Sequence, residues 1–219
     1  MNGRRSQASP SRFLPVYHLS IIALLLLAAA SIWAGERKEW VTLTDCQYID
    51  GPDNDGDSFR MRGGTKEFTA RLYYVDAPET NLKQAERTRE QSLHFGITLD
   101  ETMKAGVKAK DRVRELLKKP FMVWTRWAIA GGRGRESRYY VMIEVDGKNL
   151  GEILLSEGLA RTKGTAPNLP TGEKARDYMR RLEDVEREAC KKRAGAWSTS
   201  TIETCEERDQ PTPSPSPMP

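Results

Sequence analysis

The 219-residue sequence predicts an α+β fold in which five short strands form a β-barrel and about three helices pack on it. Five segments show strand-like alternation or runs of β-branched and aromatic residues, each bounded by turn residues. A long helical pattern lies between the third and the fourth of these segments. This order of elements is typical of an OB-fold, a barrel that binds nucleic acids or saccharides.

Turn residues separate the predicted strands. Gly51-Pro52 ends the first strand, and Gly63-Gly64-Thr65 divides the second from the third. A connection this short predicts an antiparallel hairpin. The strands are expected at 40–49, 57–62, 66–75, 121–127 and 139–145.

Helices are expected at 98–119, 150–157 and 171–193. Thr98 and Glu101 have the spacing of a capping box, and Pro120 ends the first helix. Gly158 favours the end of the second helix, and Trp197 is expected to fold back onto the body after the third. Residues 80–96 are polar and are expected to form an irregular insert, which either covers the functional site or decorates the surface.

The two ends of the chain differ in composition from the predicted domain at 35–200. Residues 1–34 combine three arginines with an apolar run and small residues, which is typical of a secretory signal peptide or, alternatively, an uncleaved membrane anchor. Without Arg4, Arg5 and Arg12 the net charge falls from +4 to about +1, so overall charge does not indicate a nucleic-acid partner. Residues 206–219 are proline-rich and are expected to be disordered.

Acidic residues and an arginine gather around the second and third strands. Asp57 stands in Asp55-Gly-Asp57-Ser58, and the run Arg71-Leu-Tyr-Tyr-Val-Asp76-Ala-Pro-Glu79-Thr80 follows it. Carboxylates can hold a hard cation and orient water, while a guanidinium stabilises the negative charge of a phosphorane. The pattern therefore suits phosphodiester chemistry, and Arg138 is the candidate for a second cationic clamp.

The alternation of side chains along a strand decides whether Arg71 and Asp76 can lie together. Strict alternation from Arg71 would put Asp76 on the opposite face of the strand. The two side chains converge only if barrel twist or a bend before Ala77-Pro78 turns the chain. Without such a bend they form a surface pair at a strand end. Asp53 and Asp55 are expected to form the preceding turn, since the segment lacks the glycine and the glutamate of an EF-hand loop.

Two blocks of sequence resemble a known family. Asp55-Gly-Asp57-Ser58-Phe59, together with the run that begins at Arg71, resembles the staphylococcal nuclease-like (thermonuclease) domain. The segment from Ser137-Arg138 to Gly158-Leu-Ala160 resembles that family's second conserved block. The resemblance covers about Trp40 to Trp197 and implies an OB-fold nuclease that gives 3′-phosphate and 5′-hydroxyl ends.

The resemblance also implies roles for individual residues. Asp57, Asp76 and the backbone carbonyl of Ala77 correspond to the ligands of Ca²⁺. Glu79 corresponds to the general base or the residue that positions water. Arg71 and Arg138 correspond to the arginines that grip the scissile phosphate through planar, bidentate donors.

The chain departs from the family after Gly158-Leu-Ala160. Two tyrosines that stack on the nucleotide in founding members are replaced here by Arg161-Thr-Lys-Gly164-Thr-Ala166, so the aromatic platform for the base is missing. Further phosphate contacts are expected from Lys163 and from Arg133 and Arg135 in a glycine-arginine loop. The alternative for that loop is a solvated surface segment.

Three cysteines are an odd number for an exported chain, so one disulfide and one free thiol is the simplest arrangement. Cys190 with Cys205 is the first pairing, Cys46 with Cys205 the next, and three reduced cysteines the alternative. Cysteine spacing and the near absence of histidine argue against a zinc site. His94 has no neighbouring nucleophile motif and is expected to be a surface or packing residue.

Two functions from different classes follow. The first is an exported Ca²⁺-dependent endonuclease of low sequence specificity that acts on DNA or RNA in the periplasm or outside the cell. It would be a monomer without a small-molecule cofactor, and it would contact the membrane only through an uncleaved amino-terminal segment. The second is a noncatalytic OB module that binds nucleic acid or protein.

Overall fold

A computed structural model describes residues 39–131, 137–164, 167–203 and 205 of the chain. These residues belong to one compact unit, 39–219. The expected signal or anchor at 1–34 and the expected tail at 206–219 lie outside the described residues.

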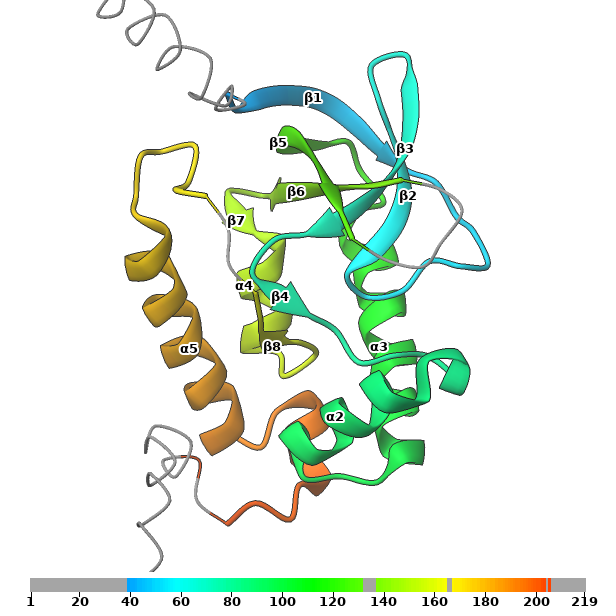
Figure 1. Cartoon of the computed structure of the whole chain (residues 1–219), viewed down its shortest axis with the longest axis vertical. Coiled ribbons are helices and arrows are strands. Elements are labelled where there is room, and N and C mark those ends of the chain that lie inside the picture. The colour runs from blue at the N-terminus through cyan, green and yellow to red at the C-terminus, as the bar shows by residue number, and fades with distance from the viewer. Residues whose placement is uncertain (1–38, 132–136, 165–166, 204, 206–219) are drawn as a thin grey trace, which may run out of the picture. The chain divides into compact units, whose positions relative to one another are not determined.

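Five strands close a barrel, as the sequence predicts (Figure 1). The hydrogen-bonded order β3-β2-β1-β5-β6 is antiparallel, and a parallel pairing of β3 with β6 closes the circle. Asp45 in β1 and Trp127 in β5 have φ values of 55° and 52°, and each lies where the strand register shifts. Such bulges bend strands, which helps a sheet to close. The strands are β1 Val41–Tyr48, β2 Ser58–Gly63, β3 Lys66–Leu72, β5 Phe121–Ala130 and β6 Arg138–Val145.

Three two-residue strands extend this framework. β7 (Lys148–Asn149) pairs with the end of β6. β4 (Val75–Asp76) leaves the barrel after β3 and pairs antiparallel with β8 (Arg161–Thr162). This second pairing places Asp76 opposite Arg161, 85 residues later in the chain.

Within the described residues four α-helices accompany the barrel, where about three were expected. The additional helix is α2, which together with a 3₁₀ turn makes most of the 80–96 insert helical, so the expected irregular insert is wrong. The Thr98–Glu101 capping box at the start of α3 is confirmed. The helices are α2 Ala85–Phe95, α3 Leu99–Leu116, α4 Leu150–Ser156 and α5 Ala175–Lys191, with 3₁₀ turns η1 Leu82–Gln84 and η2 Gly195–Thr199.

Buried apolar residues form two clusters. The larger fills the barrel and the faces of α3, α4 and α5 that cover it, with Phe59, Met61 and Leu154 fully buried. The smaller, which we call the satellite core, joins the end of α2 to α5 and η2; its buried members are Phe95, Ile97, Ala105, Ala189, Cys190, Ala196 and Trp197. The expected return of Trp197 onto the body is confirmed, since its side chain is completely buried.

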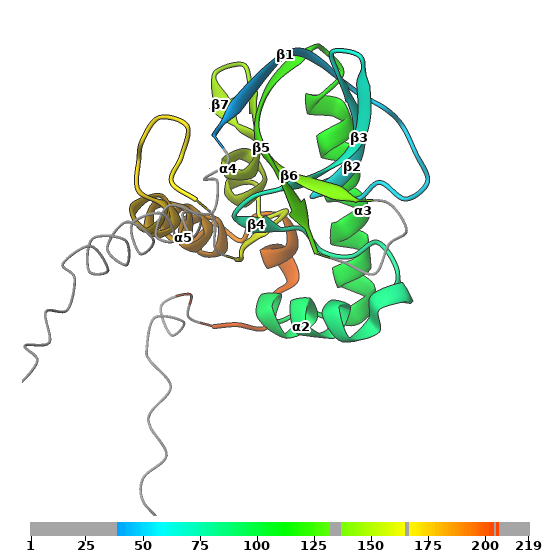
Figure 2. The same cartoon turned by 45° about the horizontal axis from the view of Figure 1, so that its top comes forward.

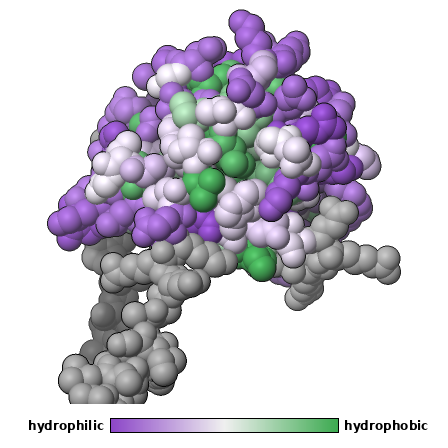
Figure 3. Space-filling view, turned by 90° about the horizontal axis from the view of Figure 1, so that it is seen from above, coloured by the Kyte–Doolittle hydropathy of each residue, from purple (hydrophilic) through white to green (hydrophobic). Residues whose placement is uncertain are grey.

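Figures 1 and 2 place α2 near the end of α3 that is farther from β1. On the face shown in Figure 3 the surface is mainly hydrophilic, with a small central group of apolar side chains. None of the helices in the described part of the chain combines the length and apolar character of a membrane span.

Candidate functional site

The acidic residues selected from the sequence converge on Arg71. This arginine extends from β3, and its Nη2 lies 2.9 Å from Asp76 Oδ1 while its Nη1 donates to Asp57 Oδ1. The carboxylates of Asp57 and Asp76 are almost completely buried, with side chains 1% exposed. Glu79 joins the same group through Arg87. The structure thus brings together Asp57, Arg71, Asp76 and Glu79.

A bend between β3 and β4 allows Arg71 and Asp76 to meet. β3 ends at Leu72, and Tyr74 has a φ of 67°, a conformation that bulky residues rarely adopt. The Tyr74 hydroxyl donates to the Pro167 carbonyl at 2.7 Å, and its ring packs on Tyr178. These contacts hold a bend before Ala77-Pro78, as the alternation of the strand requires; it lies at Tyr74, three residues before Ala77.

The loop before β2 aims Asp57 at the same point. Asp55 Oδ1 accepts from the backbone N–H groups of Asp57 and Ser58 at 3.0 and 2.5 Å, which confirms Asp55 as a turn former. Asp57 Oδ2 in turn accepts from the Ala77 backbone N–H at 2.8 Å. The side chain of Asp57 therefore ties the β2 loop directly to the Asp76-Ala77 segment.

Helix α3 supports this segment from behind through two close approaches. A Cβ on Gly106 would lie 2.5 Å from the carbonyl oxygens of Pro78 and Glu79, and one on Gly56 would lie 2.7 Å from the Cβ atoms of Ala77 and Ala109. Real Cβ contacts are never this short, so both positions require glycine. The backbone that carries Glu79 consequently rests on α3 without an intervening side chain.

Two residues of α2, Arg87 and Gln91, belong to the site although the sequence did not identify their roles. They are four residues apart, so both face the acids from one side of the helix. Gln91 Nε2 donates to Asp76 Oδ2 at 3.0 Å and to the Ala77 carbonyl at 2.8 Å, and its Oε1 accepts from the Glu79 N–H. Because the segment is mostly polar, no apolar stripe marks it as a helix, and the i, i+4 pair of Arg87 and Gln91 is the available signal.

Arg87 touches three carboxylates at once. Its Nη2 donates to Asp76 Oδ1 and lies 3.5 Å from Asp57 Oδ2, while its Nη1 lies 2.9 Å from Glu79 Oε1. The insert that the sequence left undecided between a cover and a decoration therefore contributes charge to the site.

Arg161 is the third arginine on Asp76 and was also missed as a site residue. It extends from β8, with Nε and Nη2 2.9 and 2.8 Å from Asp76 Oδ2. The ammonium of Lys163, a residue expected to contact phosphate, lies 4.0 Å from Asp76 and 3.0 Å from Glu90. Its exposed head is thus held at the edge of the acidic group. The pairing of β8 with β4 could be found only from the folded structure.

The two buried aspartates have different electrostatic surroundings. Burial raises the pKa of Asp57, assisted by the charges of Asp55 and Asp76 and opposed by Arg71 and Arg87. Burial would also raise the pKa of Asp76, but Arg87, Arg71 and Arg161 together lower it below its usual range. Burial raises the pKa of Glu79 despite the nearby Arg87. Asp76 is therefore the firmly ionised centre of the group.

Arg138 lies beside this centre and apart from its carboxylates. It begins β6 and is in register with Thr69 of β3. Its Nη1 donates to Ser58 Oγ at 3.2 Å, and its Nη2 to the Gly131 carbonyl at 2.7 Å. Since Ser58 is in register with Arg71, the two arginines lie near each other on adjoining strands. Arg133 and Arg135 lie outside the described residues.

The donor set of Asp57, Asp76 and the Ala77 carbonyl suits calcium, which binds carboxylate and carbonyl oxygens together with water. Within the described residues, no group of three or more Asp, Glu, His or Cys side chains is arranged to hold a metal. The two aspartates instead accept from arginines, and the Ala77 carbonyl accepts from Gln91. The ligand chemistry fits Ca²⁺, while the contacts observed are with arginines and a glutamine of the protein.

The other sequence-selected residues lie elsewhere. Cys190 and Cys205 form the first expected disulfide, which closes 15 residues, and Cys46 is free and buried.

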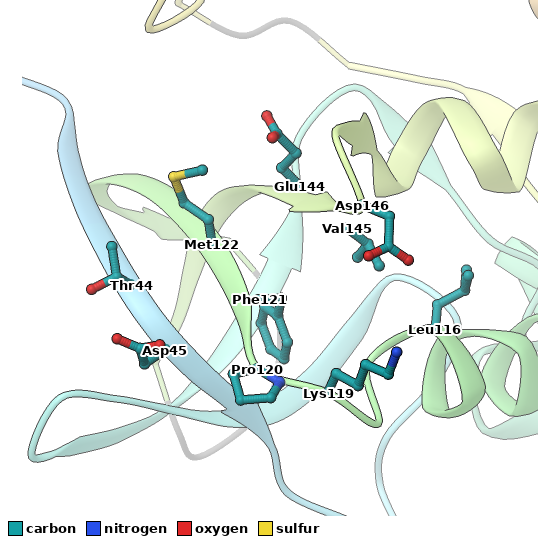
Figure 4. A pocket seen from close by; sticks show the side chains of 10 residues that line it. All are labelled: Thr44, Asp45, Leu116, Lys119, Pro120, Phe121, Met122, Glu144, Val145 and Asp146. Carbon is teal, nitrogen blue, oxygen red and sulfur yellow. The ribbon is translucent and has the colours of Figure 1, made fainter.

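A pocket of about 320 Å³ between the ends of β1, β5 and β6 contains none of the site residues (Figure 4). His94 Nε2 lies 2.6 Å from Glu186 Oε1, and its ring packs on Phe95, which confirms the expectation of a packing residue.

Comparison with known proteins adds one finding. The sequence model of a family described as staphylococcal nuclease homologue matches residues 69–199, more than half of the chain. No curated protein matches. The matched segment contains Arg71, Asp76, Glu79 and Arg138, and it begins after Asp57.

Proposed function

Since the chain belongs to the staphylococcal nuclease homologue family, we propose that it is a Ca²⁺-dependent endonuclease. It would hydrolyse phosphodiester bonds of DNA and RNA with low sequence specificity, leaving 3′-phosphate and 5′-hydroxyl ends. The observation that carries the proposal is the convergence of Asp57, Arg71, Asp76 and Glu79, with Arg138 on the strand that pairs with β3.

Arg71 and Arg138 are the proposed phosphate clamps. Both are carried by strands of the closed barrel, and a rigid frame lets a planar guanidinium donate two hydrogen bonds to a phosphate without further ordering. Arg71 is held by Asp57 and Asp76, and Arg138 by Ser58 and the Gly131 carbonyl. Their charges would stabilise the phosphorane as negative charge develops on its oxygens.

Glu79 is the proposed acceptor of the proton from water, or the residue that orients it. Its backbone is fixed by Gln91 and by the close approach of Gly106, so its carboxylate is presented from a rigid segment. Asp57, Asp76 and the Ala77 carbonyl would hold Ca²⁺, which, when bound, polarises the phosphate and supplies positive charge. The chain's own residues would then orient the water and stabilise the leaving oxygen.

Substrate preference follows from what surrounds these groups. Lys163 lies at the edge of the site, and its cationic head is the proposed contact for a neighbouring phosphate. Arg133 and Arg135 are proposed to contribute in the same way. Contacts with the phosphate backbone of a nucleic acid carry no sequence information. The two tyrosines that stack on the nucleotide in founding members of the family are replaced here. Both facts support low sequence specificity. We further propose export after removal of residues 1–34, with an anchored form as the alternative.

The test is cleavage of single-stranded and duplex DNA and of RNA by the purified protein, with Ca²⁺ or with a chelator. Arg138→Ala and Glu79→Gln should each reduce the cleavage rate by about 100-fold or more, and end-group analysis should find 3′-phosphates. Arg89→Gln, on the exposed side of α2, is the control. Binding of nucleic acid without cleavage in both conditions would instead support the noncatalytic OB module.

A further inference from the structure

Each carboxylate of the acidic centre has an arginine partner within the protein. Asp57, Asp76 and Glu79 supply three carboxylates, and the guanidinium groups of Arg71, Arg87 and Arg161 lie within ion-pair distance of them. Buried carboxylates need compensating charge, because removal from water strongly destabilises an unpaired ion. The three arginines meet this need within the protein.

Arg87 makes the contacts that a bridging cation would make. It is the arginine that reaches all three carboxylates, through Asp76 Oδ1, Asp57 Oδ2 and Glu79 Oε1. Asp57 and Asp76 are also the carboxylates proposed to hold calcium. Two cations that share the same oxygens repel each other strongly in a poorly hydrated site. Arg87 in this position would therefore compete with a calcium ion for Asp57 Oδ2 and Asp76 Oδ1.

Of the three arginines, Arg87 is the one that can leave. Its side chain is 20% exposed, against 13% for Arg71 and 5% for Arg161. It extends from α2, outside the barrel, on a long side chain that can turn toward solvent. The helix itself need not move, because Gln91 and Phe95 hold it independently of Arg87.

We propose that Arg87 is a built-in competitor of calcium, which must release Asp57, Asp76 and Glu79 before Ca²⁺ binds there. The inference rests on the proposed function, because it concerns the same ion site. In this view the chain has a lower calcium affinity, and its buried carboxylates keep arginine partners when calcium is scarce. Arg87 is a residue that sets ion affinity and is assigned no part in bond cleavage.

The test is calcium binding measured by isothermal titration calorimetry on the full chain as wild type, Arg87→Gln and Arg89→Gln. Arg87→Gln should lower the Kd for Ca²⁺ at least tenfold, or about 1.4 kcal/mol, and Arg89→Gln should change it less than twofold. Thermal unfolding gives a second readout. Arg87→Gln should melt below wild type in chelator and gain more than wild type when Ca²⁺ is added, because the ion replaces the lost charge.

An unchanged or weaker calcium affinity in Arg87→Gln, or no binding in any variant, overturns the inference. If Arg87→Gln does not fold without calcium, Arg87→Lys carries the test. A single ammonium cannot bridge three carboxylates as the guanidinium does, so its Kd should fall between wild type and the expected Arg87→Gln value. Cleavage assays separate the two proposals. If the protein cleaves DNA in a calcium-dependent way but Arg87→Gln does not bind Ca²⁺ more tightly, the nuclease is retained and the competition is rejected. If Arg87→Gln binds Ca²⁺ more tightly but no variant cleaves, the competition is retained and the nuclease is rejected.

Discussion

One side of α2 faces the acidic centre of Asp57, Asp76 and Glu79, and its carboxyl end lies on the satellite core. Ion pairs and hydrogen bonds hold the first contact, and apolar packing holds the second. At the acidic centre Arg87 and Gln91 meet charged partners that no apolar side chain could satisfy. At the satellite core Phe95 and Trp197 are completely buried, with ring centroids 4.7 Å apart. The apolar end fixes where the helix lies, and the polar side uses that position to present charge. Substitutions at the apolar end should alter stability alone, and those at the polar side should also alter ion binding.

Arg71→Ala should have the largest effect, because this residue serves both purposes. Cleavage should fall by about 100-fold or more, and the free energy of unfolding by about 3–5 kcal/mol, since two buried carboxylates lose a partner. Urea denaturation and cleavage rates measure the two losses. Arg138→Ala is the comparison: its partners are a hydroxyl and a carbonyl, so it should lose activity with a stability change below about 1 kcal/mol. Equal stability of Arg71→Ala and wild type would contradict the ion network.

Trp197→Ala would remove the largest side chain of the satellite core. We expect a loss of about 3–5 kcal/mol in the free energy of unfolding, typical of a large-to-small change in a packed interior. Cleavage by the folded fraction should stay within about threefold, because every catalytic candidate is carried elsewhere. The control is Leu93→Ala on α2, whose side chain is 74% exposed and should cost less than about 0.5 kcal/mol. A collapse of activity in folded Trp197→Ala would show that the two ends of α2 are coupled.

The Cys190–Cys205 disulfide closes 15 residues around the satellite core. Cys190→Ser should lower the free energy of unfolding by about 3 kcal/mol, the value expected for a loop of that length. Denaturation with and without reductant measures this: wild type should weaken on reduction, and Cys190→Ser should not respond. A reductant response in the variant would mean that another pair of cysteines forms.

The smallest effect concerns Glu186, which joins α5 to α2 and β8. It accepts from the Thr162 backbone N–H at 2.7 Å and faces His94. Burial would raise the pKa of Glu186, but hydrogen bonds from His94 and Thr162 lower it overall. A carboxyl with a lowered folded pKa stabilises the fold above its unfolded pKa of about 4.3, and this contribution is lost as pH falls through the folded value. Glu186→Gln should cost about 1–2 kcal/mol at pH 6.

In denaturation curves measured at several pH values, this difference between Glu186→Gln and wild type should shrink below about pH 4. A difference that stays constant from pH 6 to pH 3 would contradict the assignment of the effect to ionised Glu186.

Much of the barrel could be predicted because its strands carry local signals. The glycine turn between β2 and β3, the capping box of α3 and the cap at Gly158 each depend on residues close together in sequence. The prediction of an irregular insert at 80–96 was wrong because α2 has a mostly polar sequence, and its buried residues include Thr88 and Gln91. A helix that buries polar side chains lacks the apolar stripe by which helices are recognised.

The site was only partly predictable for a related reason. Asp57, Arg71, Asp76 and Glu79 stand within 23 residues, and their types suit one chemistry. Arg161 meets Asp76 across 85 residues, through a two-residue strand pair that has no local signature. The bend at Tyr74 is likewise imposed by contacts with Pro167 and Tyr178 from the far end of the domain. Residue type revealed the acids, and only tertiary pairing revealed the arginines that neutralise them.

The parallel pairing of β3 with β6 has a consequence for timing. It joins residues 69–72 to residues 138–141. This pairing is expected to form late in folding, because the entropy of loop closure opposes contacts between distant parts of a chain. Arg71 and Arg138 belong to opposite sides of this closure, so a growing or unfolded chain carries two separate arginines and no clamp. If the proposed cleavage activity needs both arginines, it also requires the pairing of β3 with β6.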